Sequence, residues 1–470
     1  MLKRPLYALM IVTFLLAACA GPAPTAAPTA VPPTQPPPPT AVPPTSAPAA
    51  APTSAPAATA VPPTQAPTAV PPTAAPAAAP VEITYMMWGS PEELAVWQKM
   101  VDDFQAVNPN IKVNVDVSDW DSYWQKVDTL FAGGTPPDVF AMDGPIFPDW
   151  QSRGVLLNLQ PYIDATPGFL DGFYPVALQD YKLPDGYYGL PRDFQTIVMF
   201  YNKDMFDKAG VPYPKAGWTY DDMRTMAKKL TVSSGGKTTQ WGFGADLTDM
   251  ELIYSEILWA YGGDIISADH TQTLIGEPKA RQAWQLLYDM TKTDKSMPTP
   301  DEMTQYGDLF AAGVVAMWPI GHWAANDYSK VDFKWDVAPL PAGPAGQATS
   351  VNSAGMVVAK DTKHPDEAWK FIQFALSDKE QTRLADLGLE VPAIKSATTA
   401  FLNQTATHID QQVFIDALQY AHVKPSFKGY DKWSSAVADG MAPIWNGEQD
   451  LGPTLDQVVK DADAVLAESK

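Results

Sequence analysis

Cysteine is almost absent from this 470-residue chain, because Cys19 is the only one. A single cysteine excludes an internal disulfide and leaves a thiol that needs another purpose in an exported protein. It follows the basic residues Lys3 and Arg4 and a short apolar run over residues 6 to 16, which is the order of a secretory signal. That run is too short for a stable membrane-spanning helix. The sequence therefore predicts export, with residues 1 to 18 as the signal peptide.

The four residues Leu16-Ala17-Ala18-Cys19 resemble the lipobox of bacterial lipoproteins. In a lipobox the cysteine becomes the lipid-bearing N-terminus of the mature protein. The resemblance implies that Cys19 is lipidated and anchors the protein to the outer face of the cell membrane, or in the periplasm. The alternative is a cysteine that closes an ordinary signal peptide, but lipidation accounts for the odd thiol.

Charged residues are missing from residues 21 to 80, which consist almost wholly of Pro, Ala, Thr and Val. The hexapeptide Thr-Ala-Val-Pro-Pro-Thr occurs four times there, starting at Thr29, Thr40, Thr59 and Thr68. Proline removes backbone donors and fixes φ, so such a segment favours a solvated polyproline II string and cannot form a core. Residues 19 to 80 are predicted to be a disordered tether. A role as a proline-motif ligand is the alternative, although such motifs are unavoidable at this proline density.

Long apolar runs and basic charge are scarce in residues 81 to 470. No stretch there is long enough for a membrane helix, and the length suffices for two or three domain cores. The chain has 32 basic against 53 acidic side chains, a formal charge of −21, which becomes −23 when Lys3 and Arg4 leave with the signal. A field of this sign repels nucleic acid and anionic lipid headgroups, so we expect neither as a partner of the folded part.

Strand and helix patterns alternate at the start of this part. Residues 81 to 88, 111 to 117 and 138 to 142 read as strands, separated by helical patterns at 92 to 108 and 123 to 131. Such alternation predicts an α/β fold with a parallel sheet, where ligands gather at the carboxyl ends of the strands. Further patterns predict strands at 195–202, 314–318, 337–340 and 354–358, helices at 203–209, 218–230, 250–261, 278–291 and 301–312, and a mostly helical last hundred residues.

Tryptophan is the residue in excess, because all 15 lie after residue 87. Several stand beside Gly, Pro or Asp in turn-like settings, such as Trp88-Gly89, Asp119-Trp120-Asp121, Trp318-Pro319 and Gly321-His322-Trp323. Flat rings in loops can stack on the C–H faces of sugars while neighbouring polar groups bond the hydroxyls. For each of these tryptophans, packing in the core is the competing interpretation.

Several ordered segments together resemble the extracellular solute-binding proteins of bacterial ATP-driven importers, in particular the carbohydrate-binding family that includes the maltose-binding proteins. The resemblance covers essentially residues 81 to 470. It rests on Trp88-Gly89, Phe104-Gln105-Ala106-Val107-Asn108-Pro109, the run from Leu130 to Val139, Tyr188-Gly189-Leu190-Pro191, the run from Phe200 to Phe206, Trp218-Thr219-Tyr220-Asp221-Asp222, Phe310-Ala311-Ala312-Gly313, Gly321-His322-Trp323 and Pro339-Leu340-Pro341.

The resemblance implies a periplasmic-binding-protein-like fold of two discontinuous α/β lobes, joined by a hinge and closing on a ligand. Lobe one is expected at residues 81 to 191 plus 341 to 390, and lobe two at residues 192 to 340 plus 391 to 470. The hinges would fall near residues 190 to 195 and near residues 338 to 341. Prolines at these joints would limit the directions of bending.

The resemblance also suggests ligand-binding residues. Trp323 matches the family's sugar-stacking tryptophan, Asp143 matches an aspartate that bonds sugar hydroxyls, and Gln195 falls where a ligand-binding glutamate occurs. The remaining candidates are supported less specifically, by a loose match, by their place in a first-strand loop or hinge, or by a turn-like setting: Trp433, Trp88, Ser90, Glu92, Arg192, Asp193 and Trp318. For each residue the alternative is packing between lobes or a hinge role.

The predicted function is capture of a sugar or oligosaccharide by a monomeric lipoprotein and its delivery to the permease subunits of an importer. The alternative is a tethered, secreted glycoside hydrolase, which would use two of the 53 acids about 5 to 9 Å apart. No nucleophile, phosphate-loop or dinucleotide motif supports an enzyme, and we expect no cofactor. The five histidines, at positions 270, 322, 364, 408 and 422, are too scattered to predict a metal site.

Overall fold

The computed structural model describes residues 80–247, 250–389 and 391–468. The predicted signal peptide, Cys19 and the predicted tether to residue 79 lie outside the described residues. Among the described residues, no helix combines the length and the apolar character needed to cross a bilayer.

Lobe one is built on a five-stranded sheet with the order β2-β1-β3-β14-β6. Its strands are β1 (Val81–Trp88), β2 (Ile111–Ser118), β3 (Val139–Asp143), β6 (Gly189–Pro191) and β14 (Ala354–Val358). β1 pairs in parallel with β2 and with β3, as the alternation of strands and helices predicts. β14 is antiparallel to both β3 and β6, so the sheet is mixed rather than wholly parallel. The carboxyl ends of β1, β2 and β3 therefore lie at the same edge of the sheet as the start of β14.

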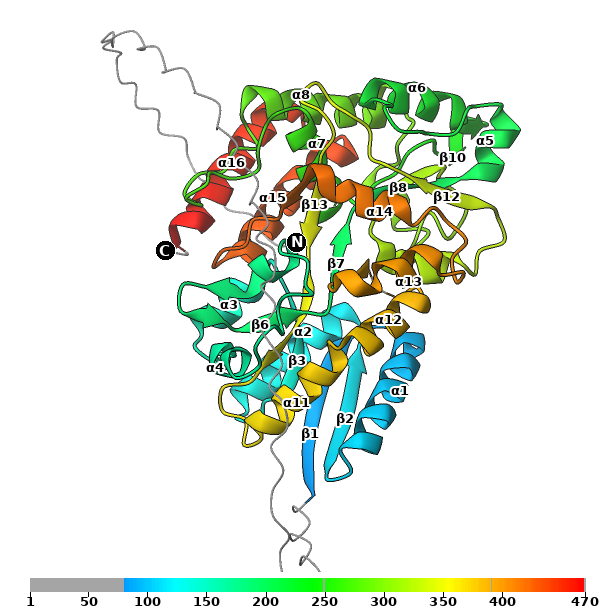
Figure 1. The fold of residues 1–470 in the computed structure, drawn as a ribbon. Coiled ribbons are helices and arrows are strands. Elements are labelled where there is room, and N and C mark those ends of the chain that lie inside the picture. The colour runs from blue at the N-terminus through cyan, green and yellow to red at the C-terminus, as the bar shows by residue number, and fades with distance from the viewer. Residues whose placement is uncertain (1–79, 248–249, 390, 469–470) are drawn as a thin grey trace, which may run out of the picture. The chain divides into compact units, whose positions relative to one another are not determined.

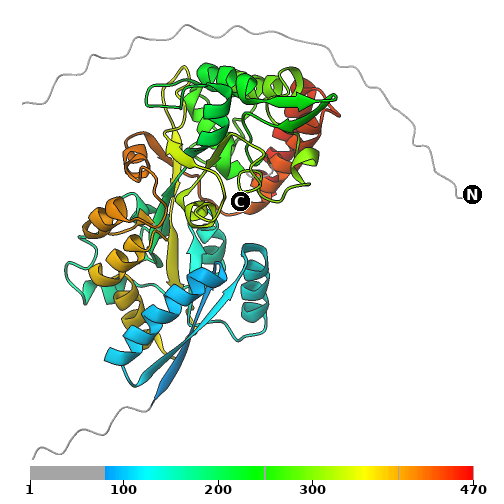
Figure 2. The ribbon, with the colours of Figure 1, turned by 90° about the vertical axis from the view of Figure 1, so that its right-hand side faces the viewer.

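Helices cover both faces of this sheet. On one face, Phe104 of α1 (Pro91–Val107) and Tyr85 of β1 both pack edge to face on Phe371 of α11 (Pro365–Ala375). Figure 2 shows α1 lying across β1 and β2. On the other face, Tyr123 donates to the Ala141 carbonyl at 2.6 Å. The smaller elements of this region are α2 (Trp120–Ala132), α3 (Phe147–Ser152), α4 (Gln160–Asp164), η1 (Ala177–Tyr181), β4 (Lys182–Leu183), β5 (Gly186–Tyr187) and α12 (Asp378–Asp386).

Lobe two is built around a three-stranded antiparallel sheet. β8 (Val198–Asn202) lies between β11 (Met317–Ile320) and β12 (Trp335–Ala338). The helices and the small hairpin assigned to this lobe are, in chain order, α5 (Lys203–Ala209), α6 (Tyr220–Leu230), β9 (Val232–Ser234), β10 (Lys237–Gln240), η2 (Met250–Tyr254), α7 (Ser255–Ala260), α8 (Pro278–Tyr288), η3 (Asp289–Thr293), α9 (Pro300–Met303), η4 (His322–Ala324), α10 (Ala325–Tyr328), η5 (Lys395–Ala397), α13 (Thr398–Asn403), α14 (Gln412–Asp416), η6 (Ala417–Tyr420), α15 (Tyr430–Asn446) and α16 (Leu451–Glu468).

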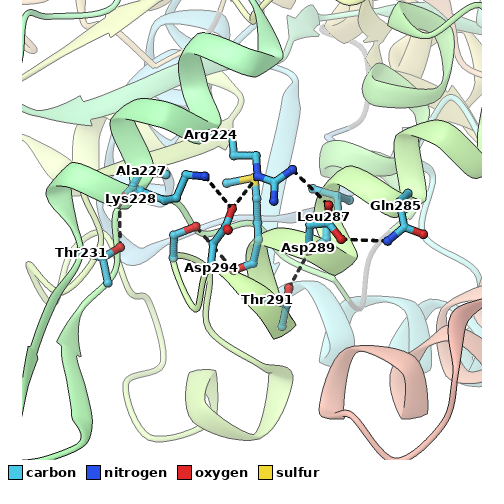
Figure 3. Close-up of polar contacts among 11 residues, drawn as sticks. Arg224, Ala227, Lys228, Thr231, Gln285, Leu287, Asp289, Thr291 and Asp294 are labelled. Carbon is cyan, nitrogen blue, oxygen red and sulfur yellow. Dashed lines mark hydrogen bonds and ion pairs between the residues drawn. The ribbon is translucent and has the colours of Figure 1, made fainter.

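Ion pairs link α6 to η3 and to Asp294, the residue directly after η3. Thr219 caps the start of α6 in a reciprocal capping box with Asp222. Arg224, one turn into the helix, binds Asp294 through Nε and Asp289 through Nη1 at 3.1 Å, and Lys228 lies 3.5 Å from Asp294 (Figure 3). The pairs join segments about 65 residues apart and lie partly out of solvent, so they link α6 to η3 with a modest contribution to stability.

A small sheet joins the two lobes. Its order is β15-β7-β13-β16, with β7 (Asp193–Thr196), β13 (Thr349–Asn352), β15 (Val391–Pro392) and β16 (Ala421–Val423). Figure 1 shows β7 and β13 side by side between the lobe-one strands and the helices of lobe two. β6 leads into β7 through Arg192, within the first predicted hinge, and β13 leads into β14 through Ser353.

The second passage between the lobes is therefore later than predicted. The expected position was residues 338 to 341, but Leu340 and Ala348 both pack in the lobe-two core, and the strand that enters the lobe-one sheet begins only at Ala354. The pattern of two prolines around Leu340 does not mark the joint. The joint is at Ser353, where the chain passes from β13, which pairs with β7 and β16, to β14, which pairs with β3 and β6.

Two predicted secondary-structure elements differ from those in the structure. The strand expected at 195–202 is two strands in different sheets, because the chain changes sheets at Ile197. The helix expected at 301–312 ends at Met303, and the segment after it contains Gly307 and Gly313 with φ of 71° and 66°. Backbone in the left-handed region interrupts a helix, and glycine adopts it readily.

Candidate ligand-binding site

Asp143 and Gln195, predicted from different parts of the chain, come together where the chain passes between the lobes. Asp143 is the last residue of β3, and its Oδ1 accepts a hydrogen bond from Asn352 Nδ2 at 3.2 Å. Asn352 stands opposite Gln195 in the antiparallel pair of β13 and β7. Among the described residues, Gln195 Oε1 and Asn352 Oδ1 have no hydrogen-bond partner. Buried amide oxygens in this state are suited to accept bonds from hydroxyl groups.

Arg192 and Asp193 form a buried ion pair beside this cluster. Arg192 Nε lies 3.2 Å from Asp193 Oδ2, and the two residues are only 4% and 3% exposed. Burial raises the pKa of Asp193, while the Arg192 charge and a bond from the Ala354 amide oppose that shift. Both predicted residues are therefore brought to the passage, where the pair ties β6, β7 and β14 together.

An aromatic group lies at the ends of the first two strands. The Trp88 ring packs edge to face on Trp120 and Tyr123, with centroids 5.0 and 5.3 Å away, and tilted against Trp124. The Arg192 guanidinium carbon lies 5.4 Å from the Trp88 ring centroid, which links the aromatic group to the ion pair. Trp120 is 44% exposed although it is the first residue of a helix. Its turn-like setting is visible in the sequence, but Trp120 is not among the predicted site residues.

Trp323 is the other exposed tryptophan, with 42% of its surface accessible. It lies in η4, directly after β11, and η4 packs against β7, the strand that carries Gln195. A Cβ atom on Gly321 would overlap the Trp323 ring, so this glycine lets the ring approach the backbone closely. Lobe two thus places the exposed Trp323 ring close to β7, the strand that carries the predicted site residue Gln195.

Four other predicted residues have different surroundings. Trp433 is fully buried and donates to Thr273 Oγ1 at 2.9 Å, and Trp318 is 6% exposed in β11 opposite Phe200. Ser90 caps α1, because its hydroxyl accepts from the Glu93 amide at 3.2 Å. Glu92 lies in α1, but its side chain is outside the described residues. In this structure, packing accounts for the two tryptophans and capping accounts for the serine.

A cavity of about 520 Å³ lies nearby, between elements of both lobes. It is lined by Phe147, Pro148, Gln179, Asp180, Lys182 and Leu183 from the lobe-one part of the chain, and by Trp259, Asp264, Ile266, Ser267, Ala268, His270 and His422 to Ser426 from the lobe-two part. None of the predicted site residues lines it. Ser426 Oγ donates to the Gly144 carbonyl at 2.9 Å, next to Asp143, so the cavity borders the predicted site.

Asp180 is a buried acidic residue in the lining of this cavity, and no sequence motif predicts a role for it. It is 9% exposed and accepts two bonds from Ser353, at 2.9 Å from the amide and 2.6 Å from the hydroxyl. Burial raises the pKa of Asp180 to about 6, against the effect of these bonds and of the Lys424 charge. Ser353 lies at the joint between β13 and β14, so the bonds to Asp180 stabilise the chain where it passes between the lobes.

The chemistry of the whole arrangement favours binding of a polar, uncharged molecule. It offers exposed indole faces, amide oxygens and buried carboxylates whose charges are countered by neighbouring basic groups. Within the described residues, no group of three or more His, Cys, Asp or Glu side chains is arranged to hold a metal ion.

Two lobes joined at a double chain passage, with polar and aromatic side chains gathered there, define a ligand-binding protein of the two-lobed α/β class. The family model described as bacterial extracellular solute-binding protein matches residues 88–382, which is more than half of the chain. The chain belongs to this family, as the sequence resemblance indicates. Its relatives and structural neighbours include substrate-binding proteins of ABC transporters.

Individual relatives agree with this assignment. The ABC substrate-binding protein Lmo0181 from Listeria monocytogenes, solved in complex with cycloalternan, is 29% identical, has a TM-score of 0.77, and matches over 83% of this chain and 99% of its own. The maltotriose-binding protein of Pyrococcus abyssi is 23% identical over 79% of this chain and 76% of its own length. The GacH receptor of Streptomyces glaucescens shares the fold with a TM-score of 0.71 at 21% identity, over 83% of this chain and 100% of its own.

Proposed function

We propose that this protein captures a sugar or oligosaccharide between its two lobes and delivers it to the permease of an ABC importer, without catalysing a reaction. The observation that carries the proposal is the position of Asp143 and Gln195 at the passage between the lobes, with Trp88 on the lobe-one side and Trp323 beside β7 on the lobe-two side. Both halves offer one aromatic face and one polar group.

This pairing suits a sugar because its ring has two kinds of surface. The C–H faces pack on indole rings, while the hydroxyls at the ring edge bond to carboxylate and amide groups. A ligand that touches both lobes at once favours the closed arrangement, because only its differential contacts can shift the equilibrium. The names of two relatives, one a maltotriose-binding protein and one solved with cycloalternan, support the carbohydrate class.

The proposal includes the lipid anchor at Cys19 and the tether after it. The tether would keep a monomeric receptor close to its permease at high effective concentration, whereas the lipid supplies the membrane attachment. A test is expression in a bacterial host with and without Cys19→Ser. We expect membrane-fraction protein for the natural chain and released protein for the variant; equal release of both would contradict the anchor.

A screen of melting temperatures against mono- and oligosaccharides tests the carbohydrate ligand. A saccharide at 100 times its dissociation constant adds ~2.7 kcal/mol to the folded state and raises the melting temperature. If only peptides, polyamines or metal ions raise it, the carbohydrate proposal is wrong. Appearance of shortened saccharides in the same mixtures would instead support the alternative of a glycoside hydrolase.

Trp323→Ala tests the proposed site. We expect it to remove the saccharide shift with little change in the melting temperature of the free protein, because the ring is 42% exposed. Val232→Ala, at an exposed residue of β9, is a matched control that should leave both unchanged. Unaltered saccharide binding by the Trp323 variant would exclude this ring as a contact.

A further inference from the structure

His322, the residue before Trp323, is buried although its neighbour is exposed. Its ring is 0% exposed and lies edge to face against Phe401 and Phe414, with centroids 4.9 Å away in each case. Its Nε2 is 2.9 Å from Gln411 Oε1. The turn that carries Trp323 is thereby attached to the chain segment that contains α13 and α14.

The polar contacts behind His322 form a chain of side-chain amides and one hydroxyl. Gln411 Nε2 donates to Thr407 Oγ1 at 2.7 Å, and Gln404 Nε2 donates to the same hydroxyl oxygen at 2.6 Å. The Gln411 amide nitrogen is bonded to Thr407 and its oxygen faces the imidazole, and this orientation assigns the ring proton to Nε2. Burial lowers the pKa of His322 to about 4, so the ring is a neutral donor at neutral pH.

The same segment also holds β7, the strand of Gln195. Thr196 Oγ1, one residue from Gln195, donates to the Phe414 carbonyl of α14 at 3.0 Å. Phe414 therefore contacts the imidazole with its ring and β7 with its backbone. Trp323 and Gln195 are therefore both attached to the segment that contains α14, although more than a hundred residues separate them in the chain.

We infer that His322 is a positioning residue, which through its bond to Gln411 holds the exposed Trp323 ring at a set position relative to Gln195. The lobe-two half of the site is then formed before a ligand arrives. This inference rests on the proposed function for its effect on affinity, but the position of the ring itself can be tested without any ligand. A preformed aromatic face avoids the ordering cost that a free side chain would add on binding.

The test uses 5-fluorotryptophan in the full-length protein and follows the Trp323 fluorine resonance, assigned with Trp323→Phe. The variants are His322→Phe, which keeps the ring volume but removes the bond, Gln411→Leu, and the double variant. Gln412→Leu is the matched control, because Gln412 is the next residue and its side-chain amide donates to the exposed Asp416 side chain, at 2.8 Å, rather than to His322 or Thr407. Circular dichroism melting identifies any variant that does not fold, and Gln411→Leu covers the case in which His322→Phe fails.

We expect both single variants to shift or broaden the Trp323 resonance, the double variant to add nothing further, and Gln412→Leu to leave it unchanged. Non-additivity is the mark of residues that act through one contact. Affinity for maltotriose, measured by titration calorimetry, should fall about tenfold in each single variant, with a similar loss in the double. An unchanged resonance in folded His322 and Gln411 variants overturns the inference. An unchanged maltotriose affinity in Trp323→Ala counts against the proposed binding site. In that case the fluorine resonance of Trp323 alone tests whether His322 positions the ring.

Discussion

The two halves of the candidate site offer similar chemistry on different supports. In lobe one, Trp88 and Asp143 stand at the carboxyl ends of β1 and β3, two regular strands of one sheet. In lobe two, Trp323 is on a short turn and Gln195 on a four-residue strand, and side-chain bonds through α14 hold that region together. The lobe-one half is positioned by backbone pairing, whereas the lobe-two half depends on buried polar side chains. The lobe-two half should therefore be the one that single substitutions disturb without unfolding the lobe.

The largest effect is expected from the buried ion pair that joins the halves. Arg192→Ala leaves Asp193 buried without its counter-charge, which should cost about 3 to 5 kcal/mol of folding free energy. Urea unfolding followed by fluorescence measures the loss. Lys112→Ala removes the exposed pair with Glu82 and should cause no measurable change. Equal effects of the two substitutions would show that the pair at the passage is not a structural tie.

The pH dependence of stability should have opposite signs in the two halves. Burial lowers the pKa of His322 to about 4, and it raises the pKa of Asp180, in the cavity that borders the lobe-one half, to about 6. The unfolded chain protonates histidine near pH 6.5, so acidification from there towards pH 4 removes on the order of 3 kcal/mol of stability through His322. Folded Asp180 takes up its proton near pH 6 and the unfolded carboxyl only near pH 3.9, so the same acidification adds on the order of 3 kcal/mol through Asp180.

Two variants separate these opposing effects. Between about pH 7 and about pH 4.5, Asp180→Asn should lose stability more steeply than the natural protein, and His322→Phe less steeply. Chemical unfolding at both pH values supplies the comparison. Parallel behaviour of all three proteins would mean that neither group changes its pKa on folding.

Trp120 provides the lobe-one counterpart of the Trp323 test. Trp120→Ala should weaken saccharide binding about tenfold, equivalent to ~1.4 kcal/mol, because its exposed ring packs on Trp88 and extends the aromatic face. The folded state should lose less, since nearly half of the ring is in solvent. Titration calorimetry beside a melting curve measures both. A large drop in melting temperature with intact affinity would assign Trp120 to packing.

The smallest effect is expected outside both halves, at the ion pairs of α6 in Figure 3. Arg224→Ala should destabilise the protein by about 1 kcal/mol, because the pairs with Asp289 and Asp294 are only partly shielded from water. Saccharide affinity should not change. A change in affinity without a change in stability would show that this outer layer of lobe two communicates with the site.

The local pattern of the sequence predicts lobe one better than lobe two. β1, α1, β2, α2 and β3 lie within a few residues of their predicted bounds, because each has a clear apolar period and short connections. The expected helix at 301–312 and the single strand at 195–202 were wrong, since glycine backbone and a change of sheet leave little periodic signal. Turns and sheet changes depend on contacts between distant segments.

The candidate site likewise has residues that the sequence predicts and residues that only the structure identifies. Trp323 and Trp433 are both tryptophans in polar local sequence, yet one is 42% exposed and the other is fully buried against Thr273. Asn352 and Asp180 belong to no motif. The pairing of β13 with β7 places Asn352 opposite Gln195, and the bonds from Ser353 place Asp180 at the joint between β13 and β14. Burial is a property of the assembled fold, which residue type alone cannot give.

By itself the sequence determined the composition of the chain: one cysteine after an apolar run, a proline-rich segment without charge, and an acidic folded part that begins with alternating strands and helices. These properties are local, so a short window is enough to read them. Only the tertiary structure decided where the chain crosses between lobes, which tryptophans keep an exposed face and which polar groups meet at the passage. Those features arise from contacts between segments that are far apart in the chain, whose energies no single segment contains.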